Sequence, residues 1–172
     1  MERTRVSDQR KFLCDAMLGS LSRWLRFFGL DCEFAGVEAS DDEVAARAES
    51  EGRWLLTADR ELASRGPRTV LVRSISLDDQ LVEVLSRLAP DVRPDLGRSR
   101  CGECNGELID VERDEVAAVV PPYVLRTATR FKRCDRCGRV FWPGTHSGRI
   151  LARMRRVVDR IETDGPRHPT PV

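Results

Sequence analysis

Aspartates at the ends of predicted strands form one candidate chemical site. Asp15 directly follows an apolar run and Asp59 follows another, whereas Asp41 and Asp42 lie in the first turn of a predicted helix. Carboxylate oxygens gathered in this way suit Mg²⁺ or Mn²⁺, because a divalent ion relieves the mutual repulsion of the acids. Such an ion also lowers the pKa of a bound water and promotes hydrolysis of a phosphodiester. We therefore treat these four acids as candidate catalytic residues.

Helix capping is an alternative explanation for part of this acidic set. Residues 40–43 read S-x-x-E, a capping box, and acids in a first turn favour the positive end of the helix dipole. This explanation suffices for Asp41 and Asp42, and for Asp78 in a second cap. It suits Asp15 less well, because the residues beside Asp15 are apolar. Asp15 is therefore the stronger candidate for a metal ligand.

Four cysteines in the second half of the chain have the spacing of a metal site. They form two C-x-x-C pairs, Cys101/Cys104 and Cys134/Cys137, with 29 residues between the pairs. In an intracellular protein this spacing is typical of zinc, and four thiolates complete the tetrahedral shell of a structural ion. We therefore expect a zinc ribbon, in which the metal supplies folding free energy that so small a module does not gain from apolar burial.

Alternating strand and helix patterns predict an α/β domain that positions the acids. The strand-like runs are residues 10–15, 31–36, 54–57 and 69–72. Helical periodicity or capping signals follow each of these runs, although the third is followed only by a short helical turn. This alternation is typical of a parallel sheet flanked by helices. Because sites in such sheets lie outside the carboxyl ends of the strands, we expect Asp15 and Asp59 to share one edge.

Changes in composition divide the chain into five predicted segments. They are a disordered leader (1–10), an α/β domain (11–97), a zinc ribbon (98–146), a C-terminal helix (147–162) and a flexible tail (163–172). Within the ribbon, residues 107–111 and 115–120 have the patterns of strands. The ribbon therefore resembles two cysteine knuckles joined by a small sheet.

Charged residues are distributed unevenly along the chain. Residues 11–97 contain 11 Lys/Arg and 16 Asp/Glu, whereas residues 98–162 contain 14 and 9. The asymmetry either reflects an arginine-rich composition or marks an acidic metal site joined to a polyanion-binding surface. Arg23 and Arg26 fall outside the apolar stripe of the first helix, so we expect them to face outward. The candidate nucleic-acid contacts are Arg23, Arg26, Arg130, Lys132, Arg133 and Arg136.

The sequence contains no membrane-spanning segment. A membrane helix needs about 20 apolar residues, and no run approaches that length. Residues 1–10 also lack the apolar core of a signal peptide. We therefore expect a cytoplasmic protein without a membrane partner, and the sequence leaves open whether it forms a homo-oligomer.

Three stretches together resemble the Mut-seven C-terminal RNase domain family. They are F-L-C-D-A-M-L-G-S-L-S-R-W-L-R at residues 12–26, T-A-D-R-E-L at residues 57–62, and the two knuckles followed by F-W-P-G-T-H at residues 141–146. The resemblance covers about residues 11–157. It implies a PIN-like parallel sheet flanked by helices, followed by a small zinc ribbon and a C-terminal helix.

The resemblance also implies an activity and the residues that carry it. It implies a ribonuclease that hydrolyses RNA phosphodiester bonds through a bound Mg²⁺ or Mn²⁺ ion. The matching acids are Asp15, Asp41 and Asp59, with Asp42 as a competitor of Asp41. Thr57 matches the supporting hydroxyl of the T-x-D element. PIN sites commonly have a fourth acid, and the reasonable candidate is Asp78.

We therefore expect a metal-dependent ribonuclease with a structural zinc ribbon that either binds RNA or is purely structural. An alternative is a non-catalytic RNA-binding module whose acidic site is vestigial. A third hypothesis is a receiver-like phosphoacceptor domain, because such domains also hold Mg²⁺ with acids at strand ends. The scarcity of lysine argues against the third hypothesis, since only Lys11 and Lys132 occur.

Overall fold

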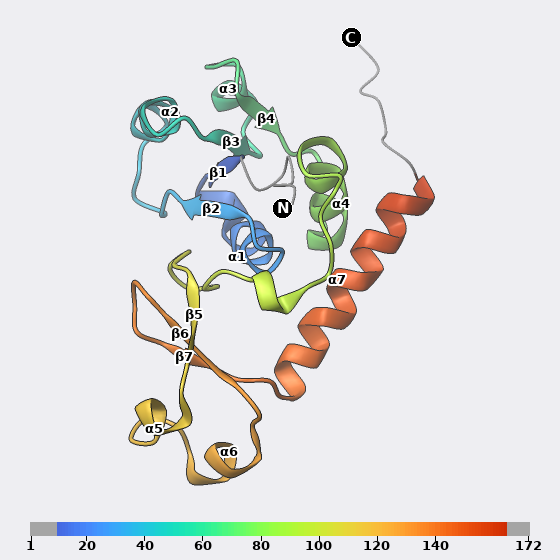
Figure 1. The fold of residues 1–172 in the computed structure, drawn as a ribbon. Coiled ribbons are helices and arrows are strands. Elements are labelled where there is room, and N and C mark those ends of the chain that lie inside the picture. Colours follow the sequence, from blue (N-terminus) through green and yellow to red (C-terminus); the bar gives the residue numbers. More distant parts are fainter. Residues whose placement is uncertain (1–9, 165–172) are drawn as a thin grey trace, which may run out of the picture.

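The computed structural model describes residues 10–164, which form a parallel α/β domain, a small antiparallel ribbon and one long helix that runs beside both (Figure 1). Residues 1–9 of the predicted leader and residues 165–172 of the predicted tail lie outside the described range. No helix within residues 10–164 combines the length and the apolar character that crossing a membrane requires.

The α/β domain is built on a four-stranded parallel sheet in the order β2-β1-β3-β4. Its strands are β1 (Lys11–Cys14), β2 (Asp31–Phe34), β3 (Trp54–Thr57) and β4 (Thr69–Leu71). In the central strand β1, the side chains of Phe12, Leu13 and Cys14 are fully buried. A central parallel strand is apolar throughout because helices cover both faces of its sheet.

Helices pack on both faces of this sheet. They are α1 (Gly19–Phe27), α2 (Asp41–Ser50), α3 (Arg60–Ala63) and α4 (Leu77–Leu88). Successive strand residues point to opposite faces. Leu13 and Leu55 therefore pack with apolar residues of α2 and α3, whereas Phe12 and Leu56 belong to the larger core that contains α1 and α4. The predicted fold class, an α/β parallel sheet flanked by helices, is confirmed.

The ribbon is a three-stranded antiparallel sheet in the order β5-β6-β7. Its strands are β5 (Leu108–Val111), β6 (Phe131–Cys134) and β7 (Val140–Phe141), and the short helix η3 (Leu96–Arg98) precedes them. The apolar core of the ribbon is small and consists of Val116, Val120, Ala128 and Phe131. So few buried side chains supply little folding free energy, which leaves a large role for a bound metal.

The prediction of a strand at residues 115–120 is wrong. The connection between β5 and β6 instead contains two short helices, α5 (Arg113–Val116) and α6 (Pro122–Thr127). A capping box between Glu112 and Glu115 starts α5. Val116 and Val120 are four residues apart, so one helical turn places both in the ribbon core.

The C-terminal helix α7 (Thr145–Asp164) joins the ribbon to the α/β domain. It begins beside the ribbon and runs along α4 (Figure 1). Its apolar stripe, which includes the fully buried Met154, joins the main core. Arg153 Nε lies 2.5 Å from Asp78 Oδ1 on α4, and Arg153 also covers the ring of Trp24. The helix extends beyond the predicted 147–162 at both ends.

We predict that Met154→Ala destabilises the protein by about 2–5 kcal/mol, because it removes a fully buried side chain and leaves a cavity between α7 and the main core. Urea unfolding followed by circular dichroism measures this change. Arg155→Ala is the control, since Arg155 is exposed on the same helix. Equal unfolding midpoints for the two variants would contradict the role of α7 in the core.

Candidate functional site

The four predicted metal ligands form one compact cluster. The Sγ atoms of Cys101 and Cys137 are 3.7 Å apart, and those of Cys104 and Cys134 are 3.3 Å apart. All four sulfurs lie within 4.8 Å of one another. Zn–S bonds of about 2.3 Å in a tetrahedron require sulfurs just under about 4 Å apart, so the cluster is close to the size that zinc needs. The cysteines are therefore positioned to hold a metal ion, as predicted.

The environments of the cysteines shift the pKa values of their thiols in different directions. The backbone N–H of Arg139 donates to the sulfur of Cys137 and lowers the pKa of that thiol to about 7. Desolvation raises the pKa of Cys104 to about 12, and it also raises the pKa of Cys101. Four neighbouring thiolates need a cation to compensate their charge, and a soft divalent ion such as zinc fits this donor set.

Asn105 fastens the first knuckle to the edge of the parallel sheet. It directly follows the cysteine pair, is buried, and has a backbone φ of +65°. Its Oδ1 accepts from the backbone N–H of Cys32 at 3.0 Å, and its Nδ2 donates to Asp31 and Glu33 at 2.8 and 3.1 Å. Asn105 is not among the residues predicted from the sequence. The Asn-Gly pair at this position was an available signal, because asparagine tolerates positive φ.

The carboxyl groups that meet Asn105 remain readily ionised. Burial by itself would raise the pKa of Asp31, but hydrogen bonds from Arg53 and Asn105 lower it. Burial would likewise raise the pKa of Glu33, but hydrogen bonds from Asn105 and Arg136 lower it. Charged hydrogen bonds thus stabilise the anionic form of both side chains.

Arg26 does not face outward as the helical pattern predicted. Its side chain is only 4% exposed. Its Nε donates to the carbonyl of Cys32 at 2.7 Å, and its Nη1 donates to the carbonyls of Gly102 and Glu103 at 3.0 and 3.2 Å. The guanidinium is thus used inside the protein, between β2 and the first knuckle, and is not exposed to RNA. The knuckle covers it, and a helical wheel of α1 alone does not include that contact.

Other predicted RNA contacts lie on the surface, where several of them form ion pairs with acidic side chains. Arg23 Nη2 lies 3.0 Å from Glu103 Oε1, and Arg136 Nη1 lies 2.8 Å from Glu33 Oε1. Such exposed pairs are weak and exchange readily with solvent or another anion. Arg136 nevertheless connects the second knuckle to β2.

The remaining three cations lie on or just before β6. Lys132 Nζ is 3.4 Å from Asp110 Oδ2, and Arg133 donates to the backbone carbonyl of Glu115 at 2.8 Å. Arg130 is exposed and makes no salt bridge within residues 10–164. Of the predicted RNA contacts in the ribbon, Arg130 is therefore the one whose side chain is most available to a ligand.

Asp15 lies at the carboxyl end of β1 and is only 5% exposed. Its Oδ1 accepts from the backbone N–H of Met17 at 3.0 Å, so Asp15 caps the short helix η2 (Ala16–Leu18) despite its apolar neighbours. Its Oδ2 accepts from the hydroxyl of Thr57 and from the backbone N–H of Ala58. No salt bridge reaches Asp15 in the described part of the chain, so hydrogen bonds alone hold this carboxyl group.

Thr57 links Asp15 to Asp59. The Thr57 hydroxyl donates to Asp15 and accepts from the backbone N–H of Asp59 at 2.9 Å. Asp59 is exposed, and its Oδ1 caps α3 by accepting from the backbone N–H groups of Glu61 and Leu62 at 2.7 and 2.9 Å. Neighbouring parallel strands thus place Asp15, Thr57 and Asp59 at one edge, as the strand pattern predicts.

Asp41 and Asp42 lie at the start of α2 and are both exposed. The predicted capping box between Ser40 and Glu43 is present, so this turn has a structural role without any metal. Arg65, which the sequence analysis missed, lies 3.9 Å from Asp41 and contacts Asp42. No sequence signal indicates this pairing, because it depends on how α2 and α3 pack.

The predicted acids do not gather around a single point in this structure. Within residues 10–164, the four cysteines are the only group of three or more potential His, Cys, Asp or Glu ligands whose atoms all lie within 4.8 Å. Asp59 is turned toward its cap, and Asp41 lies near Arg65. Asp78, the candidate fourth acid, instead pairs with Arg153 of α7.

Comparison with known proteins identifies one family. The model of the Mut7-C RNAse domain matches residues 10–154. The matched range contains both the cysteine cluster and the acids after β1 and β3. No curated protein and no solved structure matches the chain.

We predict that Gly106→Ala lowers metal affinity by about 10–100-fold, as changes beside metal ligands commonly do. A Cβ atom at this position would lie 2.5 Å from Cys134 Sγ and 2.6 Å from Asp135 Oδ1, so it displaces a ligand. Competition with a chromogenic zinc chelator measures the change. Gly148→Ala is the control, because nothing lies within 4 Å of the added atom. Unchanged affinity in Gly106→Ala would show that the knuckle tolerates the displacement.

We also predict that Arg26→Gln lowers the free energy of unfolding by about 2–4 kcal/mol, because buried carbonyl groups lose their donors. Arg23→Ala, on the exposed face of the same helix, should change it by less than about 0.5 kcal/mol. Denaturant unfolding compares the two variants. If Arg26→Gln unfolds like the wild type but binds RNA less tightly, Arg26 is an RNA contact and its internal role is refuted.

Proposed function

Because the chain belongs to the Mut7-C RNAse domain family, we propose that it is a ribonuclease whose strand-end aspartates bind a Mg²⁺ or Mn²⁺ ion. Its substrate is RNA, and the reaction is hydrolysis of a phosphodiester bond. The cysteine cluster holds a structural zinc ion, because four thiolates leave no coordination position for water.

The environment of Asp15 is the observation that carries this proposal. A buried carboxylate is costly unless another charge compensates it. Asp15 is nearly inaccessible to solvent, and within residues 10–164 it receives three hydrogen bonds and no ion pair. A divalent ion at the same strand edge would supply a compensating positive charge. Thr57 fixes the orientation of Asp15, which is the supporting role expected for the T-x-D threonine.

Asp15 and Asp59 would hold the ion, with Asp41 as the third carboxylate ligand and Asp42 as its competitor. When bound, the ion would lower the pKa of a coordinated water and stabilise charge on the phosphate. Asp59 caps α3 with Oδ1 alone, so the cap does not require Oδ2. Arg65 competes for Asp41 and Asp42, and its displacement frees these acids. Exposed cations of the ribbon, Arg130 above all, attract the RNA backbone.

The non-catalytic RNA-binding module is the second candidate, and one observation favours it. The carboxylates of Asp15, Asp41 and Asp59 do not lie within 4.8 Å of one another in the described chain. A protein whose acidic site has become structural would retain the caps on η2 and α3 and lose the ability to hold an ion. It would still bind RNA in a salt-dependent manner.

The two candidates are separated by cleavage of labelled single-stranded RNA in the presence of Mn²⁺ or Mg²⁺. We predict that Asp15→Asn and Asp59→Asn each reduce the cleavage rate by about 100-fold or more, because each removes a charge that holds the ion. RNA affinity, measured without a divalent ion, should change little in both variants.

Asp114→Asn is the matched control, because Asp114 is an exposed acid on α5 of the ribbon. Cleavage by Asp114→Asn should match the wild type. Equal cleavage by wild type and Asp15→Asn, or no cleavage by the wild type with either ion, refutes the ribonuclease proposal. RNA binding that persists in that case supports the non-catalytic module.

A further inference from the structure

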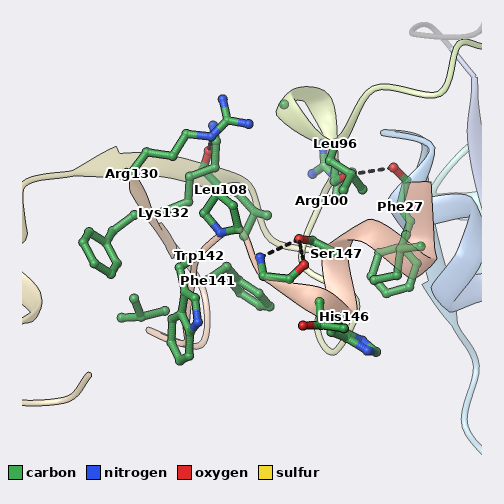
Figure 2. A pocket seen from close by; sticks show the side chains of 18 residues that line it. Phe27, Leu96, Arg100, Leu108, Arg130, Lys132, Phe141, Trp142, His146 and Ser147 are labelled. Atoms are coloured by element: carbon green, nitrogen blue, oxygen red, sulfur yellow. Dashed lines mark hydrogen bonds between the residues drawn. The ribbon is translucent and has the colours of Figure 1, made fainter. Parts of the chain in front are cut away.

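A cavity of about 400 Å³ lies where the ribbon meets the start of α7 and the end of α1 (Figure 2). This volume is within the range of pockets that bind small organic groups, about 300–1,000 Å³. Figure 2 shows Phe141 and Trp142 on the ribbon side and Phe27 across from them. None of the predicted catalytic acids lines this cavity. It is therefore a separate site from the strand edge that contains Asp15.

The aromatic side chains of the cavity remain partly exposed. Trp142 is 37% exposed, and Phe141 and Phe27 are half-buried. Large aromatic rings in contact with water lose the stabilisation that full burial provides, so their exposure at a concave site indicates a ligand surface. Flat aromatic faces bind flat ligands by stacking, and nucleobases are the flat groups that RNA-binding proteins stack in this way.

The cations of the cavity favour an anionic ligand. Arg100, Arg130 and Lys132 line it, and no acidic residue does. Outside the cavity, Arg100 Nη1 lies 3.7 Å from Glu107 Oε1 and Lys132 Nζ lies 3.4 Å from Asp110 Oδ2, and such pairs exchange readily with another anion. Arg100 Nε donates to the carbonyl of Asn105 at 2.9 Å, which fixes its position. Arg130 is exposed and has no salt bridge among the described residues. Aromatic faces beside such a cation complement a base with its attached phosphate, whereas an apolar peptide or a fatty chain would leave Arg130 without an anion.

We propose that this cavity binds one unpaired base of single-stranded RNA. The base stacks against Phe141 and Trp142, and the adjoining phosphate pairs with Arg130 and Lys132. The proposal rests on the proposed function only in taking RNA as the ligand. It makes the ribbon a substrate-selecting surface that accepts single strands and rejects duplexes, because the bases of a duplex are already paired and stacked.

Fluorescence anisotropy with a labelled single-stranded oligoribonucleotide tests the proposal, using the zinc-loaded full chain without added Mg²⁺ or Mn²⁺. Trp142→Ala should weaken binding by about 5–150-fold, the effect of losing one stacked base. Arg130→Ala should weaken binding and reduce the slope of log affinity against log salt by about one. Trp142→Ala should not alter the affinity for a duplex of the same sequence. Arg130→Ala should weaken duplex binding only by the loss of its phosphate contact.

Matched controls lie on α6 of the same ribbon, outside the cavity. Tyr123→Ala removes an aromatic ring that is 69% exposed, and Arg126→Ala removes an exposed cation. Both should bind RNA like the wild type. Equal losses in Trp142→Ala and Tyr123→Ala, or equal wild-type affinity for single strand and duplex, overturn the proposal. If Trp142→Ala loses zinc or unfolds, Trp142→Phe and Arg130→Ala decide the proposal. Trp142→Phe retains an aromatic face for stacking, and Arg130 lies on the surface, where its removal does not disturb the fold.

Adenosine monophosphate distinguishes a free nucleotide from RNA. If it binds as tightly as the oligonucleotide and Trp142→Ala weakens both equally, the site belongs to a free nucleotide and the RNA proposal is wrong.

Cleavage assays separate this proposal from the ribonuclease activity. Loss of cleavage in Asp15→Asn together with unchanged binding in Trp142→Ala refutes the cavity alone. Absence of cleavage in the wild type together with weakened binding in Trp142→Ala refutes the ribonuclease alone.

Discussion

The attachment of the first cysteine knuckle to strand β2 is the contact on which the two parts of the molecule depend. β2 is an edge strand of the parallel sheet, so some of its backbone groups have no neighbouring strand to pair with. Asn105 accepts from the backbone N–H of Cys32, and Arg26 donates to the carbonyl of the same residue. Side chains of the knuckle and of α1 thus satisfy the free backbone groups of Cys32 and cover part of an edge that would otherwise promote association.

This attachment couples the metal site to the α/β domain. Asn105 follows Cys104 directly, so the knuckle turn that carries two of the four candidate metal ligands also presents Asn105 to β2. Arg136, between the cysteines of the second knuckle, adds an ion pair with Glu33 of β2. A bound ion holds both knuckles in the geometry that these contacts require. Metal binding therefore stabilises the sheet edge as well as the ribbon.

The long helix α7 provides a second connection between the two parts, through apolar burial and charge together. Its apolar residues complete the core of the α/β domain, while Arg153 and Arg160 reach Asp78 and Asp79 of α4. Its first residues line the cavity that also contains Trp142. Two independent connections fix the orientation of the ribbon, and a fixed orientation is what a composite cavity requires.

Local patterns in the sequence determined the strands and helices of the α/β domain, the four-cysteine site and the strand-end positions of Asp15 and Asp59. These features depend on periodicity, capping and spacing within short segments, which the sequence contains directly. The family resemblance, which the match over residues 10–154 confirms, added the expected activity.

Only the tertiary structure decided which polar side chains form hydrogen bonds and ion pairs with residues remote in the sequence. Arg26 resembles a surface arginine on an isolated helix, but Gly102, 76 residues away, accepts its hydrogen bond and covers it. Arg65 engages the acids of α2 only because α2 and α3 pack on the same face of the sheet. The cavity is lined by five separate segments of the chain, from Phe27 of α1 to Ile150 of α7. Such contacts form between residues remote in sequence, so no local pattern contains them.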